Sequence, residues 1–107
     1  MIEKGKYASA TENRRFVWQY IVWPLVLELN DLVFTLEQYQ MMRSRVCGES
    51  DTYAAKKMSR GLVSLVQKGI LFKDEQRLYS IHYRLVPYMR LRAECDYSTA
   101  IREIGQS

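Results

Sequence analysis

The stretch Met58-Ser-Arg-Gly-Leu-Val-Ser-Leu-Val-Gln-Lys-Gly-Ile-Leu71 carries a clear structural signal, because its hydrophobic pattern changes partway along. Before Gly69, apolar residues recur every three or four positions, which is the spacing of one helical face. Gly69 suits the left-handed backbone that commonly ends a helix. From Ile70 the pattern becomes that of a strand. The stretch therefore predicts a helix over 52–68 that leads directly into a strand.

A hairpin and a last helix are predicted after this stretch. Residues 70–72 and 78–83 have strand-like patterns, and the five charged or polar residues 73–77 separate them. Two strands joined by such a turn form a β-hairpin. Pro87 suits the first turn of a helix, and apolar residues then recur at helical spacing as far as Ile104.

Two further helices are predicted before the stretch. Thr35 and Gln38 have the spacing of a capping box, in which each side chain bonds to a backbone N–H of the first helical turn. This pair predicts a helix from 35 to about 46, preceded by a short β-prone run. A similar pattern predicts a longer helix over 9–29, and Pro24 is expected to kink it or split it.

The predicted order is helix, short strand, helix, turn, helix, hairpin and helix. This order resembles a winged helix-turn-helix domain, the kind found in small prokaryotic transcription regulators. The most specific feature is a leucine, three residues, a glycine and two apolar residues, which here are Leu65, Gly69, Ile70 and Leu71. One departure is the link over 46–52, which is longer than the tight turn of a minimal helix-turn-helix.

The resemblance covers about half of the chain and implies a fold that is mainly α with a small β-hairpin wing (α+β). A single winged helix domain over 1–107 would then comprise an N-terminal helix (9–29), the winged helix-turn-helix core (32–86) and a C-terminal helix (87–104). A length of 107 residues suits one domain with one hydrophobic core. No proline- or glycine-rich linker divides the sequence.

The excess positive charge lies in the middle of the sequence. The net charge is +4, and residues 43–77 alone hold eight basic and four acidic residues. A local basic excess of this kind favours a polyanionic partner such as double-stranded DNA.

The resemblance implies that the helix over 52–68 enters the major groove of DNA, where base edges carry a distinct hydrogen-bonding code. Arg60 suits a bidentate bond to guanine, whereas Lys56 and Lys57 suit phosphates because they are flexible point charges. The hairpin turn and the preceding helix would contact the DNA backbone or the minor groove. The predicted DNA-binding residues are Arg43, Arg45, Thr52, Tyr53, Lys56, Lys57, Arg60, Ser64, Lys73, Gln76 and Arg77.

The helices at the two ends of the sequence predict a homodimer. The helix over 9–29 has apolar residues on two faces, although a small domain covers only one face well. Exposed apolar stripes commonly mark an interface. A two-fold dimer would place two reading helices about one DNA turn, roughly 34–36 Å, apart. The predicted dimer interface comprises Trp18, Val22, Val26, Met89, Ala93, Tyr97, Ile101 and Ile104.

Other classes of function lack their sequence patterns. No glycine-rich phosphate loop, paired-carboxylate motif or metal-ligand cluster is present, so we expect no enzyme activity, cofactor, metal or small-molecule ligand. Cys47 and Cys95 lack zinc-site spacing and are expected to be reduced thiols, and His82 is expected to be structural. The apolar stretch 16–29 is too short and too polar to span a bilayer, so we expect a cytoplasmic protein without membrane contact.

The sequence thus predicts a sequence-specific double-stranded DNA-binding protein, a transcriptional repressor acting as a homodimer, of the kind found in plasmids, viruses or phages. One alternative keeps the fold and makes it a protein-interaction module, or a part of plasmid partition or replication control. A weaker alternative is RNA binding. Salt dependence of duplex binding distinguishes a DNA reader from a protein-binding module, and competition between DNA and RNA tests the last alternative.

Overall fold

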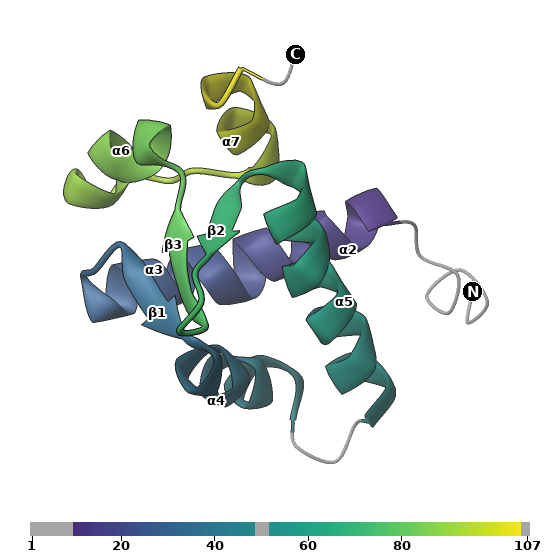
Figure 1. The fold of residues 1–107 in the computed structure, drawn as a ribbon. Coiled ribbons are helices and arrows are strands. Elements are labelled where there is room, and N and C mark those ends of the chain that lie inside the picture. Colours follow the sequence, from purple (N-terminus) through teal and green to yellow (C-terminus); the bar gives the residue numbers. More distant parts are fainter. Residues whose placement is uncertain (1–9, 49–51, 106–107) are drawn as a thin grey trace.

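The computed structural model describes residues 10–48 and 52–105 and is mostly helical with a small antiparallel sheet (Figure 1). This confirms the predicted α+β class. Residue 9, where the N-terminal helix was expected to begin, lies outside the described residues. In chain order the elements are α2 (Ala10–Phe16), η1 (Val17–Val22), α3 (Trp23–Leu29), β1 (Val33–Thr35), α4 (Leu36–Cys47), α5 (Thr52–Lys68), β2 (Leu71–Lys73), β3 (Leu78–Ile81), η2 (Tyr83–Leu85), α6 (Val86–Arg90) and α7 (Tyr97–Glu103).

The three strands form one antiparallel sheet in the order β1-β3-β2. The central strand is β3, in which Tyr79 lies opposite Phe34 of β1 and Lys73 of β2. The Phe34 and Tyr79 rings stack with their centroids 5.4 Å apart. The predicted hairpin is therefore present as β2 and β3, although β3 ends at Ile81 because the chain turns there into η2.

The N-terminal helical segments α2, η1 and α3 follow one another without a break, and η1 is a π-helix. Pro24 lies in the first turn of α3, where it has no backbone N–H to donate. The π-helix η1 lies just before it. Its wider hydrogen bonding is seen where the backbone N–H of Trp23 donates to the backbone carbonyl of Trp18, five residues earlier. The disturbance expected at Pro24 thus takes the form of a widened helical segment.

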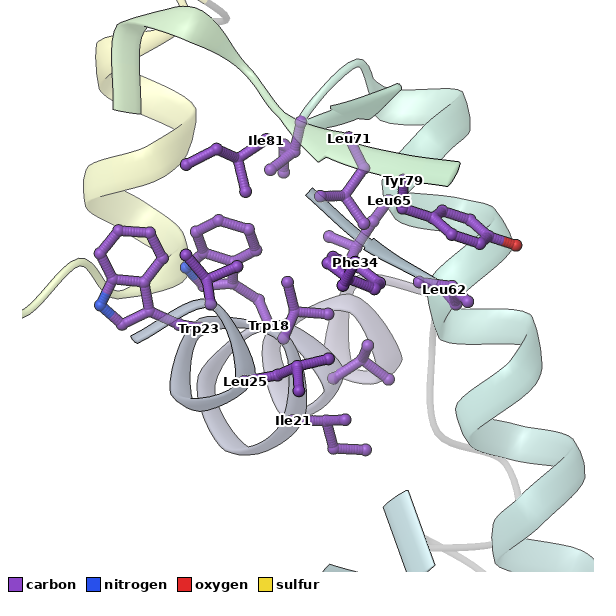
Figure 2. Close-up of a cluster of buried hydrophobic side chains, with 14 of the residues drawn as sticks. Trp18, Ile21, Trp23, Leu25, Phe34, Leu62, Leu65, Leu71, Tyr79 and Ile81 are labelled. Atoms are coloured by element: carbon purple, nitrogen blue, oxygen red, sulfur yellow. The ribbon is translucent and has the colours of Figure 1, made fainter. Parts of the chain in front are cut away.

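Most of the apolar side chains of this N-terminal helix are buried inside the chain. Trp18, Val22 and Val26 are each 0% exposed, so the prediction that they face outward as a dimer interface is wrong. Side chains from α5 and the sheet, such as Leu65 and Leu71, converge on this helix (Figure 2). The helix is central to the core, which explains why it needs two apolar faces.

The C-terminal residues cover the N-terminal helix through two tryptophans. The Trp18 indole N–H donates to the Cys95 carbonyl over 2.6 Å, and the Trp23 indole N–H donates to the Ala93 carbonyl over 3.1 Å. The two indole rings stack with centroids 5.4 Å apart. These bonds hold the non-helical segment between α6 and α7 against the core.

Two short helices replace the single helix predicted over 87–104. Arg92 adopts a left-handed φ of +53°, which ends the helical path after α6. Asp96 then caps α7 by accepting a hydrogen bond from the Thr99 N–H over 2.8 Å. The left-handed conformation of Arg92 and the Asp96 cap therefore account for the break between α6 and α7.

The apolar side chains of the stripe predicted on the last helix pack against other parts of the same chain. Met89 and Tyr97 are buried, and Ala93, Ile101 and Ile104 are half-buried. The prediction that these residues form an outward dimer stripe is wrong for the two buried side chains, because α6 and α7 pack them into the core.

The predicted bounds of α4 and α5 agree with the structure. The Thr35 side chain accepts from the Gln38 N–H over 3.1 Å, and the Thr35 N–H donates to the Gln38 side chain over 2.8 Å, which confirms the capping box. Gly48 and Gly69 follow the two helices with φ values of +84° and +87°. The expected glycine stops are therefore in place.

Two contacts fix α5 against its neighbours. The buried Tyr39 hydroxyl of α4 donates to the Met58 carbonyl of α5 over 2.7 Å, and burial raises the pKa of this tyrosine. Gly61 lies against the junction of α2 and η1, where a Cβ would overlap the Val17 side chain of η1 and lie 3.1 Å from the Asn13 carbonyl oxygen of α2. The position of α5 thus depends on a hydroxyl on one side and a glycine on the other.

Candidate nucleic-acid interface

The outer face of α5 carries polar and basic side chains along much of its length. Lys56, Arg60, Val63 and Gln67 are separated by four, three and four residues, which aligns them on one face, and all four are exposed. We call these four residues the outer stripe. The opposite face is buried through Met58, Leu62 and Leu65, among others. The helix is thus held from one side and presents the outer stripe on the other.

Two predicted DNA-binding residues of α5 lie off the outer stripe. Lys57 is half-buried and takes part in an interaction. Ser64 is half-buried, and its hydroxyl accepts a hydrogen bond from Arg14 Nη1 over 2.7 Å, while Arg14 Nε donates to the Tyr97 hydroxyl over 2.8 Å. Ser64 therefore joins α5 to α2 and α7, and a contact of Ser64 with DNA would share this hydroxyl with Arg14.

Sequence reasoning missed two members of the outer stripe, Val63 and Gln67. Their spacing from Arg60, three and seven residues, was the signal that could have found them. Beside Arg60 the surface is hollowed, with Val63 and Gln67 in the lining. The hollow is mostly apolar, so the face combines a charged group, an amide and an apolar surface.

The first two residues of α5 were also predicted to bind DNA. Thr52 and Tyr53 form the helical start of α5, and their side chains lie outside the described part of the chain.

The end of β2 and the turn that leads to β3 project polar and charged residues into solvent. Lys73, Gln76 and Arg77 are all exposed, as predicted from the hairpin pattern. The Asp74 carboxylate organises the turn by accepting from the backbone N–H groups of Gln76 and Leu78, each over 2.9 Å. Arg77 adopts a left-handed φ of +64°, which is costly for a residue other than glycine. The turn therefore presents its cations on a fixed backbone.

The two predicted arginines of α4 are placed differently from the outer stripe. Arg45 Nη1 donates to both oxygens of the Glu28 carboxylate in α3, over 2.9 and 3.1 Å. The hydrogen bond from Arg45 holds the pKa of this carboxyl below its ordinary value. Arg43 is half-buried. A contact of Arg45 with DNA would have to compete with Glu28.

An exposed row of rings lies where the hairpin leads into η2. Phe72 and Tyr83 are 50% and 68% exposed, and His82 lies between them with ring centroids 5.7 and 4.6 Å away. The guanidinium of Arg84 lies 5.7 Å from the Tyr83 ring centroid. We call these four residues the aromatic row.

His82 also has a backbone role. Its Nδ1 accepts from the Arg84 N–H over 3.1 Å and caps η2, and its pKa is lowered by burial and by the Arg84 charge. This capping agrees with the structural role expected from the sequence.

The described residues contain no candidate metal centre. Within 10–48 and 52–105, no group of three or more His, Cys, Asp or Glu side chains could hold a metal ion. Among the helices of the described residues, none is long and apolar enough to cross a membrane. Cys47 and Cys95 are separate thiols, and burial raises the pKa of Cys95 to about 12, so this thiol stays protonated at neutral pH.

Comparison with known proteins gives no relative from which to transfer a function: no protein-family model, curated protein or solved structure matches the chain.

Proposed function

We propose that the chain is a sequence-specific double-stranded DNA-binding protein of the winged helix-turn-helix kind, acting as a transcriptional repressor by occupying its site. The observation that carries the proposal is the outer stripe on α5, a helix whose other face is fixed in the core. The sheet order β1-β3-β2 and the sequence of α4, α5 and a hairpin support a winged helix arrangement. The hairpin turn would then be the wing.

The proposed mechanism follows from the dimensions of DNA. A major groove admits one α-helix, and its base edges distinguish all four base pairs. With the outer stripe in the groove, the Arg60 fork matches the O6 and N7 acceptors of guanine, and the Gln67 amide matches the N6 and N7 edge of adenine. Lys56 would bind a phosphate and so fix the register. Lys73 and Arg77 would contact the backbone from the wing.

The first test of this proposal is Arg60→Ala. Because Arg60 is exposed, its loss leaves the fold intact, and we expect specific binding to weaken by about 1–3 kcal/mol with relaxed preference at one base position. Selection of bound duplexes from a random pool, followed by titration of the best site, measures both effects. The matched control is Arg90→Ala, an exposed arginine of α6. Equal losses in the two variants would contradict the role given to Arg60.

A second test separates the charge of the wing from its backbone strain. Arg77→Gly should raise the free energy of unfolding by about 1 kcal/mol, because glycine accepts a left-handed φ. The same variant should weaken binding to all duplexes and lower the salt slope by about one, through loss of one phosphate contact. Arg77→Ala keeps the left-handed strain and should show only the binding defect. Unchanged duplex affinity in both variants would remove the wing from the interface.

The aromatic row favours one second candidate, a protein-interaction module. Exposed aromatic side chains beside an arginine are typical of protein interfaces, and Phe72 and Tyr83 have this character. A protein-binding domain would show no salt-sensitive affinity for duplex DNA. Homodimerisation stays a prediction, but the buried residues first assigned to its interface cannot form it.

A further inference from the structure

An apolar hollow interrupts the polar outer face of α5. It is a shallow depression, open to solvent, with a volume of about 420 Å³, and most of its exposed surface is apolar although several of its lining residues have polar ends. Val63, which is 54% exposed, contributes apolar surface to it. The lining residues are Ala10, Ser59, Arg60, Val63, Ser64 and Gln67. A small apolar group that comes with a polyanion would suit this hollow, because exposed Lys56 and Arg60 carry the charge of the same face.

We propose that Val63 reads the C5-methyl group of a thymine in the major groove, an inference that rests on the proposed DNA-binding function. Thymine is the only base of DNA that presents a methyl group in this groove, and small apolar side chains recognise it by contact. Val63 and Arg60 belong to the same outer stripe. A duplex drawn to Arg60 and Lys56 therefore brings its base edges to Val63.

The spacing on the helix fixes where the thymine lies. Three residues advance a helix by about 4.5 Å, and successive base pairs are about 3.4 Å apart. The thymine read by Val63 is therefore within two base pairs of the guanine assigned to Arg60. The hollow thus adds an apolar element to a site otherwise read by hydrogen bonds.

The test removes the methyl group alone. In the duplex selected by the wild-type protein, each thymine is replaced in turn by deoxyuridine, and affinity is measured by fluorescence anisotropy. We expect one replacement, within two base pairs of the guanine, to weaken wild-type binding about fourfold, as burial of one methyl group predicts. Val63→Ala should reduce that loss, because the shorter side chain contacts the methyl group less closely, and Val63→Thr should retain part of it. Val46→Ala, a change at an exposed valine of α4, should keep the full loss.

Two outcomes would overturn this inference, and they differ from failure of the proposed function. If Arg60→Ala weakens binding but no deoxyuridine replacement does, the DNA-binding function stands and Val63 reads no methyl group. If Val63→Ala shows the same deoxyuridine loss as the wild type, another residue contacts the methyl group. A protein with no affinity for any duplex would overturn both the inference and the function on which it rests.

Discussion

Trp18→Ala is expected to lower the free energy of unfolding by about 3–5 kcal/mol, the usual cost of removing a large buried aromatic side chain. Trp18 is 0% exposed, stacks on Trp23 and donates its indole N–H to the Cys95 carbonyl. The change would leave a cavity between the N-terminal helix and the segment that precedes α7. Chemical denaturation of the purified variant measures the loss.

Two further variants separate burial from the hydrogen bond. Trp18→Phe keeps an aromatic ring and leaves the Cys95 carbonyl without its donor, which should cost about 1–3 kcal/mol. Tyr20→Ala, in the same π-helical segment but 51% exposed, should cost less than about 1 kcal/mol. If Trp18→Ala left the stability unchanged and instead converted a dimer into monomers, Trp18 would belong to a dimer interface and not to the core.

Gly61→Ala is expected to destabilise the protein by about 2–3 kcal/mol, the upper part of the range for overpacking a core. In an open helix the same change gains about 1 kcal/mol, because alanine favours helix more than glycine does. Here the new Cβ would overlap the Val17 side chain and lie 3.1 Å from the Asn13 carbonyl oxygen. The helices α2 and α5 would have to separate.

A double-mutant cycle tests this explanation directly. Val17→Ala removes the methyl groups that the new Cβ would meet, so Gly61→Ala in that background should cost much less than in the wild type. Thermal or chemical denaturation of the four proteins gives the coupling. Equal costs in the two backgrounds, or a stabilised Gly61→Ala protein, would show that η1 and α5 do not meet at this glycine.

Local signals made much of the fold predictable. The bounds of α5, the capping box of Thr35 and Gln38, and the stop at Gly69 agree with the structure because each depends on residues within one helical turn. The break between α6 and α7 was missed, since the left-handed conformation of Arg92 has no glycine to signal it. Asp96, a good helix cap three residues before Thr99, was the available clue.

Burial of the N-terminal helix could not be read from its own sequence. An apolar stripe indicates that a helix face packs against something. It does not indicate whether the packing partner is another chain or a distant segment of the same chain. For Trp18 the packing partner is the segment around Cys95, 77 residues away. The same reason accounts for Ser64, whose partner Arg14 lies 50 residues away. The exposure of Lys56 and Arg60 was predictable, because helical periodicity alone separates them from Met58 and Leu62.

The salt dependence of duplex binding tests the proposed DNA-binding function most directly. Fluorescence anisotropy with a labelled duplex from the selected pool gives the association constant at several salt concentrations. For about three phosphate contacts, affinity should fall roughly fortyfold between 50 and 200 mM salt, and Lys56→Ala should lower the slope by about one. A wild-type protein with no affinity for any duplex, or with an affinity that salt does not change, would contradict the proposal that α5 enters the groove of DNA.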